Sequence, residues 1–269
     1  MNALKTTDFF ESALGRIGYH KTSNSPTGHV PLVFLHGVFL DKSLWQHLQD
    51  AVTDRLCVYV DMPGHGDSGP TPGPWHLEDC VTLLMDLLDE LKLEKVGLVG
   101  QSWGSMVGLR AAHRYPERFE RLLLCNTPTG PVSGRQRLGF KLQQMISPLK
   151  GFYGAQAAKS LYAPQSLAKH PEWSYQMRER LKKHDYREIQ RTLQAVILDA
   201  EDSSALSQNV KVPIMALRGE QDYVAPLQGA ENKVVPGGHI SPHEAPEALK
   251  IAMRSWLLAE KEPTDNSLS

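Results

Sequence analysis

Short apolar runs recur along the chain and predict buried β-strands. Each run is four to six residues long, and several are rich in Val and Leu. Neighbouring side chains of a strand point to opposite faces, so an unbroken apolar run predicts a strand covered on both faces, as in a parallel sheet between helices. The runs are residues 31–35, 56–60, 96–99, 122–125 and 212–217.

Between these runs, apolar residues recur at helical spacing. The longest pattern begins at residue 77 and advances in steps of four, three, four and three, which is one face of an amphipathic helix. Shorter patterns predict helices at residues 44–52 and 103–115. This alternation predicts an α/β protein with a mostly parallel central sheet flanked by helices. The longest pattern consists of Leu77, Val81, Leu84, Leu88 and Leu91.

The alternation stops between residues 131 and 206, where only helical patterns occur. Examples run from Leu138 to Ile146 and from Ile189 to Ile197. A long helical insertion inside an α/β sheet is expected to form a cap or lid. We therefore expect a core formed by residues 1–130 and 207–269, with a helical cap at 131–206.

Charge is divided unevenly between these two parts. Residues 131–200 contain twelve Lys and Arg but five Asp and Glu, a net charge of +7. The whole chain has a net charge of -1, so the remainder carries -8. A basic cap is consistent with an anionic substrate, or with a carrier protein that presents one. An ordinary solvated helix surface is the alternative interpretation.

The overall composition excludes several classes of partner. The 269 residues contain 29 Lys and Arg against 30 Asp and Glu, which gives the chain as a whole no general attraction to nucleic acid or to an anionic membrane. No run of about 18 apolar residues occurs, so we expect no membrane span. The first thirty residues lack the apolar stretch of a signal peptide, and three widely spaced cysteines form no disulfide framework. A reducing cytoplasm is the expected location.

Residues 100–104 read Gly-Gln-Ser-Trp-Gly, a G-x-S-x-G pattern. An apolar strand precedes it and a predicted helix follows it, which is the setting of a nucleophile elbow. Such a turn holds the serine in a strained backbone conformation, and small residues at Gly100 and Gly104 let strand and helix pass closely. Ser102 is therefore the candidate nucleophile. The alternative is a strand-to-helix turn with a capping serine.

A general base and an acid are expected on later loops. His239 follows a Gly-Gly pair beyond the last apolar run, and an imidazole can take the serine proton and return it to the leaving group. Asp222 lies just after the run at 212–217 and can orient that imidazole. His243 is the rival base. Glu220, Asp199 and Asp202 are rival acids.

Two backbone N–H groups are candidate oxyanion donors. Trp103 begins the predicted helix, and Val38 lies in the loop that closes the first apolar run. In the same loop, His36 is expected to brace the turn rather than to catalyse, and Gly37 to allow it. The candidate substrate-binding residues are His36, Gly37, Phe39 and Arg110.

In these motifs the chain resembles the α/β-hydrolase superfamily, in its serine-nucleophile, esterase-like branch with a helical cap. The resemblance runs over almost the whole length, in the order Ser, Asp, His. It implies the α/β-hydrolase fold and a catalytic triad, but it does not specify one reaction. The motifs are residues 36–37, 61–68, 100–104, 218–222 and 238–239, with Glu244 and Pro246.

Differences between these motifs and those of other branches of the superfamily narrow the range of functions. Haloalkane dehalogenases and epoxide hydrolases have a similar elbow with Asp as nucleophile, whereas this chain has Ser102. The dehalogenases also have Asn where this chain has Val38. Prolyl aminopeptidases have a similar elbow but a His-Gly-Gly-Pro-Gly loop, and residues 36–40 read His-Gly-Val-Phe-Leu. These differences argue against all three classes.

One spacing leaves a second chemistry open. Sixteen residues separate Asp222 from His239, which leaves room for about one helical turn and a four-residue strand. A similarly short segment is found in the menaquinone-pathway synthases of the superfamily, which eliminate pyruvate and hold an anionic substrate with arginines. Arg110 and the basic cap fit that alternative.

The sequence thus predicts a serine hydrolase that cleaves a small-molecule carboxylic ester or thioester through an acyl-enzyme. The alternative is a lyase or synthase that uses the same triad on an anionic substrate. No cluster of metal-ligating residues is evident, so we expect neither a metal nor an organic cofactor.

Overall fold

In the computed structural model, which describes residues 4, 7–23, 28–146 and 148–258, eight strands form one sheet in the order β1-β2-β4-β3-β5-β6-β7-β8. The pairs β1–β2 and β2–β4 are antiparallel, and every later pair is parallel. The mostly parallel sheet that the sequence predicts is confirmed. The strands are β1 (Asp8–Ser12), β2 (Gly15–Lys21), β3 (Leu32–Leu35), β4 (Cys57–Val60), β5 (Val96–Gln101), β6 (Phe119–Cys125), β7 (Ile214–Gly219) and β8 (Glu231–Val235).

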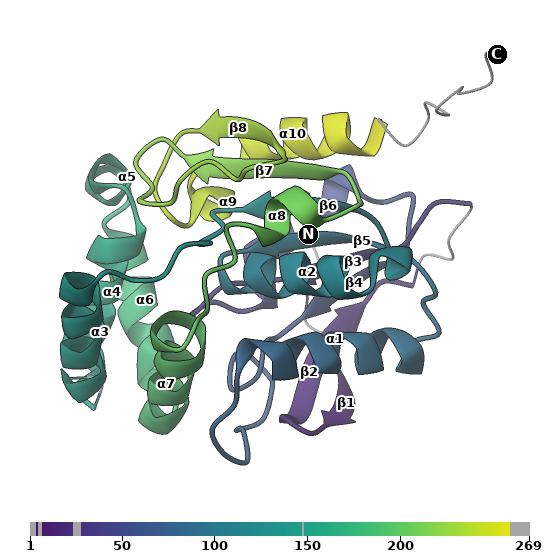
Figure 1. The fold of residues 1–269 in the computed structure, drawn as a ribbon. Helices are drawn as coiled ribbons and strands as arrows, with labels where there is room; N and C mark the ends of the chain where they lie inside the picture. Colours follow the sequence, from purple (N-terminus) through teal and green to yellow (C-terminus); the bar gives the residue numbers. More distant parts are fainter. Residues whose placement is uncertain (1–3, 5–6, 24–27, 147, 259–269) are drawn as a thin grey trace.

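Helices cover both faces of this sheet (Figure 1). In β5, a Cβ at Gly97 would lie 3.1 Å from the ring of Trp256, whereas the next residue, Leu98, meets Gly108 of the helix after the elbow. Adjacent residues of a strand face opposite sides of the sheet. The helix that carries Trp256 and the helix that carries Gly108 therefore cover opposite faces. The helices of the core are η1 (Lys42–Ala51), α1 (Leu77–Glu90), α2 (Trp103–Arg114), η2 (Pro116–Arg118), α8 (Leu206–Asn209), α9 (Ser241–Glu244) and α10 (Pro246–Leu258).

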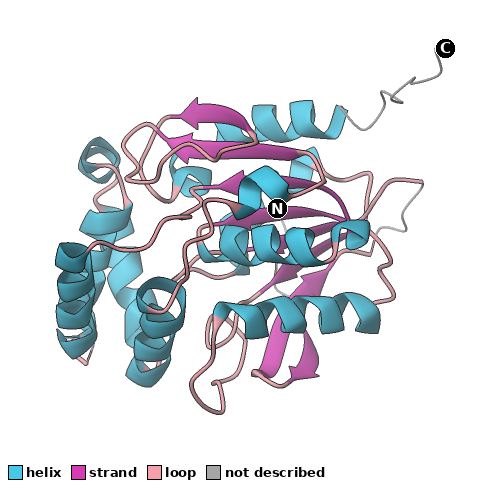
Figure 2. Cartoon of the chain, viewed as in Figure 1, coloured by secondary structure: helices cyan, strands magenta, loops and turns pink. Residues whose placement is uncertain are grey.

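Along the chain, a group of helices follows β6 and precedes β7. In space, these helices lie beside the sheet (Figure 2). We call α3 to α7 the inserted helices, and they begin and end within the range 131–206 that the sequence assigns to a cap. Their bounds are α3 (Gly134–Ile146), α4 (Lys150–Leu161), α5 (Pro164–Lys169), α6 (Glu172–Lys183) and α7 (Tyr186–Leu193), followed by η3 (Gln194–Leu198), a turn of π-helix.

Polar contacts join the inserted helices to the core. Glu188 of α7 is buried and accepts hydrogen bonds from the backbone and hydroxyl of Thr71, at 3.2 and 2.8 Å. Arg191 donates to Glu188 and to the Thr71 carbonyl, both at 2.6 Å. Arg180 of α6 pairs with Asp41, the N-cap of η1, at 3.2 Å. Two of the inserted helices are therefore fixed to core loops by charge.

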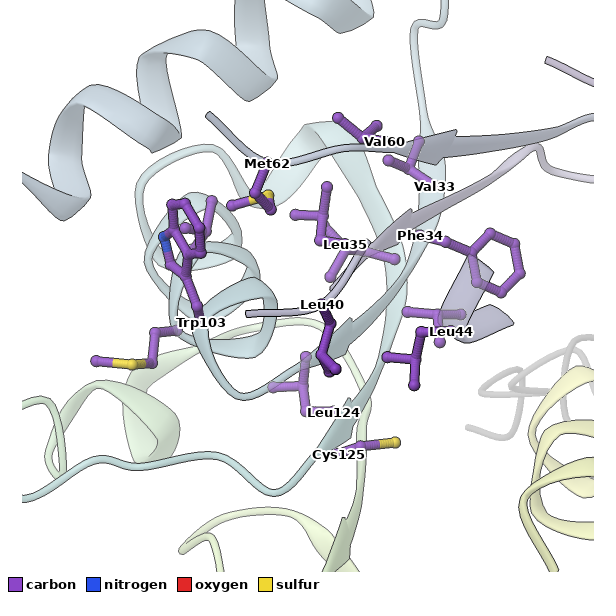
Figure 3. Close-up of a cluster of buried hydrophobic side chains, with 14 of the residues drawn as sticks. Val33, Phe34, Leu35, Leu40, Leu44, Val60, Met62, Trp103, Leu124 and Cys125 are labelled. Atoms are coloured by element: carbon purple, nitrogen blue, oxygen red, sulfur yellow. The ribbon is translucent and has the colours of Figure 1, made fainter. Parts of the chain in front are cut away.

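The hydrophobic core surrounds the first parallel strands (Figure 3). Val33, Leu35 and Val60 from β3 and β4 are fully or almost fully buried, as is Trp103 at the start of α2. The Trp103 ring stacks on Trp75, with ring centroids 5.2 Å apart. This packing fixes the carboxyl ends of the central strands, which is where the candidate residues gather.

Three strands lie outside the apolar runs found in the sequence. The strands β1 and β8 are largely exposed, β2 is buried only at its centre, and all three mix charged with apolar residues. An exposed strand needs no continuous apolar run, so periodicity alone does not reveal it. All five predicted runs overlap β3 to β7.

Candidate active site

The site forms where the strand order reverses. The chain passes from β3 to β4 on one side and then returns to β5 on the other side of β3. The loops after β3 and β5 therefore diverge, which opens the crevice typical of ligand sites in open α/β sheets. Residues 36–40 follow β3, and Ser102 follows β5.

Ser102 occupies a strained turn between β5 and α2. Its φ is 49° and its ψ is -110°, a region that non-glycine residues rarely adopt. A Cβ on Gly104 would lie 2.2 Å from the Leu35 carbonyl oxygen, and one on Gly100 would lie 2.7 Å from the Ser105 nitrogen. Strand and helix thus pass so closely that both positions require glycine. This is the geometry of the predicted nucleophile elbow.

A chain of hydrogen bonds links Ser102, His239 and Asp222. The Ser102 Oγ lies 2.8 Å from His239 Nε2, and His239 Nδ1 lies 2.9 Å from Asp222 Oδ1. Because the carboxylate accepts from Nδ1–H, Nε2 is left to accept the serine proton. The structure brings together the three residues that the sequence proposes as nucleophile, base and acid.

Asp222 is held as a carboxylate by its neighbours. Burial by itself raises the pKa of Asp222, but hydrogen bonds from His239 and Asn126 outweigh burial and lower this pKa below its ordinary value. Asn126 Nδ2 donates to Asp222 Oδ2 at 2.6 Å and to the Gly238 carbonyl at 3.1 Å. Its own Oδ1 accepts from Ser241 at 2.6 Å. Asn126 therefore ties the acid to the histidine loop.

The sequence analysis missed Asn126, although a signal was present. Asn126 directly follows the apolar run of β6, at the carboxyl end of the strand beside β7. A polar residue there faces the same edge as Ser102 and Asp222. It also has a positive φ of 54°, which only the structure reveals.

The backbone of His239 is fixed on both sides. Its N–H donates to the Leu161 carbonyl at the end of α4, and its carbonyl accepts from Gln101 Nε2, both at 2.7 Å. Glu244 accepts from Gly238 N–H at 2.7 Å and from Ala163 N–H at 2.9 Å. The histidine loop is thus connected to the inserted helices as well as to the elbow.

Tyr223 was also missed, and it covers the imidazole of His239. The two rings stack with centroids 4.7 Å apart and planes 21° apart, and the tyrosine hydroxyl lies 3.3 Å from Nε2. A neutral imidazole nitrogen has one lone pair, so Tyr223 and Ser102 compete for it. Tyr223 is the residue after Asp222, and its position along the chain gives no signal of this role.

The N–H groups of Val38 and Trp103 are available at this crevice. Within the described residues, neither of these N–H groups has a hydrogen-bond partner. Trp103 is the first residue of α2, so its N–H has no acceptor inside the helix. These are the two donors that the sequence proposes for an oxyanion.

The candidate substrate-binding residues occupy different positions. His36 is fully buried, and its Nδ1 lies 2.7 Å from the Gly37 carbonyl while Nε2 accepts from Met62 N–H at 2.9 Å. Both ring nitrogens are used within the protein, so this geometry suits a residue that braces the turn rather than one that binds substrate. A Cβ on Gly37 would lie 2.0 Å from Gln101 Oε1, so a larger residue there would displace the Gln101 side chain. Phe39 is buried and packs edge-on against Tyr153 of α4.

Arg110 lies away from this group of residues. It stands eight residues beyond Ser102, which is about 12 Å along the axis of α2. Its guanidinium donates to the carbonyls of Met106 and Glu201 and lies 3.7 Å from Glu78. These contacts tie α2 to neighbouring loops.

The rival base and acids have other partners. His243 Nδ1 lies 3.0 Å from the Tyr162 hydroxyl, and burial lowers the pKa of His243 to about 4. The carboxylate of Glu220 lies 3.5 Å from Gln165 Nε2. Asp199 accepts from Gln194, and Asp202 from Ser204.

The segment between Asp222 and His239 is simpler than expected. It contains no helical turn among residues 223–238, all of which are described, and its strand β8 has five residues rather than four. The room that this spacing leaves for a helical turn is not used. An extended loop from Tyr223 to Ala230 spans the distance because it runs directly from the end of β7 to the start of β8.

The site is closed in this structure. Ser102 is 5% exposed and His239 is 3% exposed. A cavity of about 110 Å³ lies between η1 and α6, next to the loops that carry Val38 and His239. Arg180 lines this cavity, together with Leu40, Ser43, Leu44, Gln46, Tyr162, Gln176, Met177 and His243.

In the part of the chain that the structure describes, no group of three His, Cys, Asp or Glu could hold a metal ion. No helix among these residues is long and apolar enough to cross a membrane. The three cysteines are free and buried, and burial raises the pKa of Cys57 to about 12.

Comparison with known proteins identifies the family. The model of the alpha/beta hydrolase family matches residues 32–250, and the chain belongs to this family. A 3-oxoadipate enol-lactonase 2 from Acinetobacter baylyi is 24% identical over 238 residues, which are 83% of this chain and 87% of that protein.

Two further similarities bear on the chemistry. A Bacillus subtilis protein, named provisionally as a 2-succinyl-6-hydroxy-2,4-cyclohexadiene-1-carboxylate synthase, is 32% identical over 116 residues, 42% of each chain. A thermophilic esterase from Thermogutta terrifontis, solved with malate bound, aligns with a TM-score of 0.81 and 23% identity. That alignment covers 94% of this chain and 98% of the esterase, and it shows a shared fold.

Proposed function

We propose that this protein is a serine hydrolase that cleaves a carboxylic ester or thioester of a small molecule. The hydrogen-bond chain from Ser102 Oγ through His239 to Asp222 carries this proposal. Family membership and the similarity to an enol-lactonase support hydrolysis of an ester bond.

The geometry suggests the order of events. His239 Nε2 takes the proton from Ser102 Oγ as the oxygen attacks the substrate carbonyl, and Asp222 stabilises the imidazolium. The N–H groups of Val38 and Trp103 receive the oxyanion that forms. His239 then gives its proton to the leaving alcohol or thiol. Water activated by the same imidazole hydrolyses the acyl-enzyme on Ser102.

The test is the intact mass of the protein after reaction with a small fluorophosphonate. We expect one covalent adduct on the wild type and none on Ser102→Ala. Ser105→Ala is the matched control, because that neighbouring hydroxyl donates to the Cys125 carbonyl. Ester turnover that survives in Ser102→Ala would disprove the proposal.

A lyase reaction on an anionic substrate is the second candidate. The short segment between Asp222 and His239 and the similarity to the Bacillus subtilis protein favour it. The net charge of +7 in residues 131–200 favours an anionic substrate in either case. In a lyase the base abstracts a proton and no acyl-enzyme forms. Stoichiometric trapping of an acyl group on Ser102 by a cleaved substrate would count against this candidate.

A further inference from the structure

The inserted helix α3 carries a row of exposed apolar side chains. Leu138, Leu142 and Met145 are 61%, 54% and 75% exposed. At the start of α4, Leu149 and Phe152 are also exposed, by 64% and 58%. Five large apolar residues thus face solvent within a fifteen-residue stretch. Single exposed apolar residues are ordinary, but a contiguous row marks a contact surface.

Helical geometry places these residues on one face of α3. At about 100° per residue, Leu138, Leu142 and Met145 fall within roughly 60° of the helix circumference. Arg135 lies on one side of this arc and Lys141 on the other, and both are exposed. We call Leu138, Leu142, Met145 and these two cations the α3 face.

The rest of α3 is fixed to the protein. Gln144 donates through Nε2 to the Gln190 carbonyl of α7 at 3.1 Å, and Gln190 Nε2 donates back to the Gln144 carbonyl at 3.2 Å. Figure 1 shows α3 at the outer edge of the inserted helices. The α3 face therefore points outward from a helix that is anchored on its other side.

The segment of the chain that carries the α3 face has charges of one sign. Residues 122–171 contain six Lys and Arg and no Asp or Glu. A second copy of the chain would bring Arg135 and Lys141 against the same two cations, without acidic residues from this segment to neutralise them. Like charges across such a contact disfavour self-association.

We propose that the α3 face binds the surface of an anionic lipid assembly. Aliphatic side chains flanked by Lys or Arg are the pattern of a helix that lies in a membrane interface, with the apolar row among acyl chains and the cations at headgroup phosphates. Such contact is peripheral. It does not depend on the proposed hydrolase activity.

The test is cosedimentation of the intact protein with vesicles of equimolar phosphatidylcholine and phosphatidylglycerol. We expect the wild type to bind them, and to bind pure phosphatidylcholine vesicles at least several-fold more weakly. The triple variant Leu138→Ser, Leu142→Ser, Met145→Ser should bind anionic vesicles at least tenfold more weakly. Because these side chains are exposed, the variant should retain its fold, which circular dichroism checks.

Two further variants test whether binding is specific to the α3 face and whether its cations select anionic lipid. Ile251→Ser removes an apolar side chain that is 69% exposed on α10, outside the α3 face, and should bind as the wild type does. Arg135→Glu with Lys141→Glu should abolish the preference for anionic lipid. Equal binding by wild type and triple variant, or no binding by the wild type, would overturn the proposal. A dimer in solution that the triple variant dissociates would also overturn it, in favour of a second copy.

Discussion

At the scale of single residues, the site depends on positions that make no contact with the reacting atoms. Asn126 holds Asp222, Gly238 and Ser241 through one amide group. A buried amide that satisfies three partners sets the positions of all three. Asn126 is therefore expected to act on catalysis through the orientation of Asp222.

We expect Asn126→Ala to lower kcat/KM for an ester substrate about tenfold, mainly through kcat, since the amide supports Asp222 and not the substrate. Steady-state kinetics measures the split between kcat and KM. Asn209→Ala is the control, because that exposed amide donates to the Ala205 carbonyl, close to its own position in the chain and away from Asp222. A change confined to KM would contradict a positioning role.

Substitution by Ala at two helical glycines is expected to change the free energy of unfolding in opposite directions. A Cβ at Gly104 would lie 2.2 Å from the Leu35 carbonyl oxygen, whereas one at Gly139 of α3 has open space around it. We expect Gly104→Ala to lower the free energy of unfolding by about 3 kcal/mol or more, because backbone must move. Gly139→Ala should raise it by up to about 1 kcal/mol, since Ala loses less entropy in a helix. Urea denaturation measures both, and equal effects would refute the steric account.

At the scale of elements, α7 is held to the core by a buried polar contact. Glu188 is 3% exposed, and its two oxygens are shared between Thr71 and Arg191. Removing one member of such a group leaves the others buried without partners, which costs more than the contact itself contributes.

We therefore expect Glu188→Ala to lower the free energy of unfolding by about 2–3 kcal/mol. It should also speed proteolysis within residues 130–200. Glu179→Ala is the matched control, because Glu179 pairs with Lys182 on the exposed side of α6 and should contribute less than about 0.5 kcal/mol. If both variants lost the same free energy of unfolding, the buried contacts of Glu188 would contribute no more to stability than the exposed Glu179 pair does.

At the scale of the whole molecule, histidines lie where the core meets the inserted helices. Burial, with help from Arg180, lowers the pKa of His184 to about 4, and burial lowers the pKa of His65 well below its ordinary value. The two rings contact each other, with centroids 4.7 Å apart. The junction thus requires neutral imidazoles.

A pH dependence of stability follows from His184. An unfolded histidine titrates near pH 6.5, so between pH 6.5 and 4 the unfolded chain binds more protons than the folded one. The stability that neutral His184 contributes is therefore fully present above about pH 6.5, and it is lost as the pH falls toward 4. His184→Gln should remove about 2 kcal/mol of the difference in unfolding free energy between pH 7 and pH 5. His113→Gln, on the exposed end of α2, is the control, and an unchanged pH slope in His184→Gln would contradict the argument.

The sequence by itself determined the parallel core, the elbow and the residues of the Ser102–His239–Asp222 chain. These features are encoded locally: an unbroken apolar run needs two covered faces, and a serine between glycines at the start of a helix needs a tight turn. The strands β1, β2 and β8, which are exposed over much or part of their length, carry no such local signal, because solvent accepts many residue types.

Only the tertiary structure decided which distant groups meet. Asn126 and Tyr223 reach the site because β6 and β7 are neighbours whose ends lie at one edge of the sheet. Arg110, by contrast, is turned toward Glu78 and Glu201. The apolar row of α3 was visible as a helical pattern, but the pattern did not show which side of the helix would remain exposed. Such outcomes depend on packing between segments far apart in the chain, which periodicity within one segment does not encode.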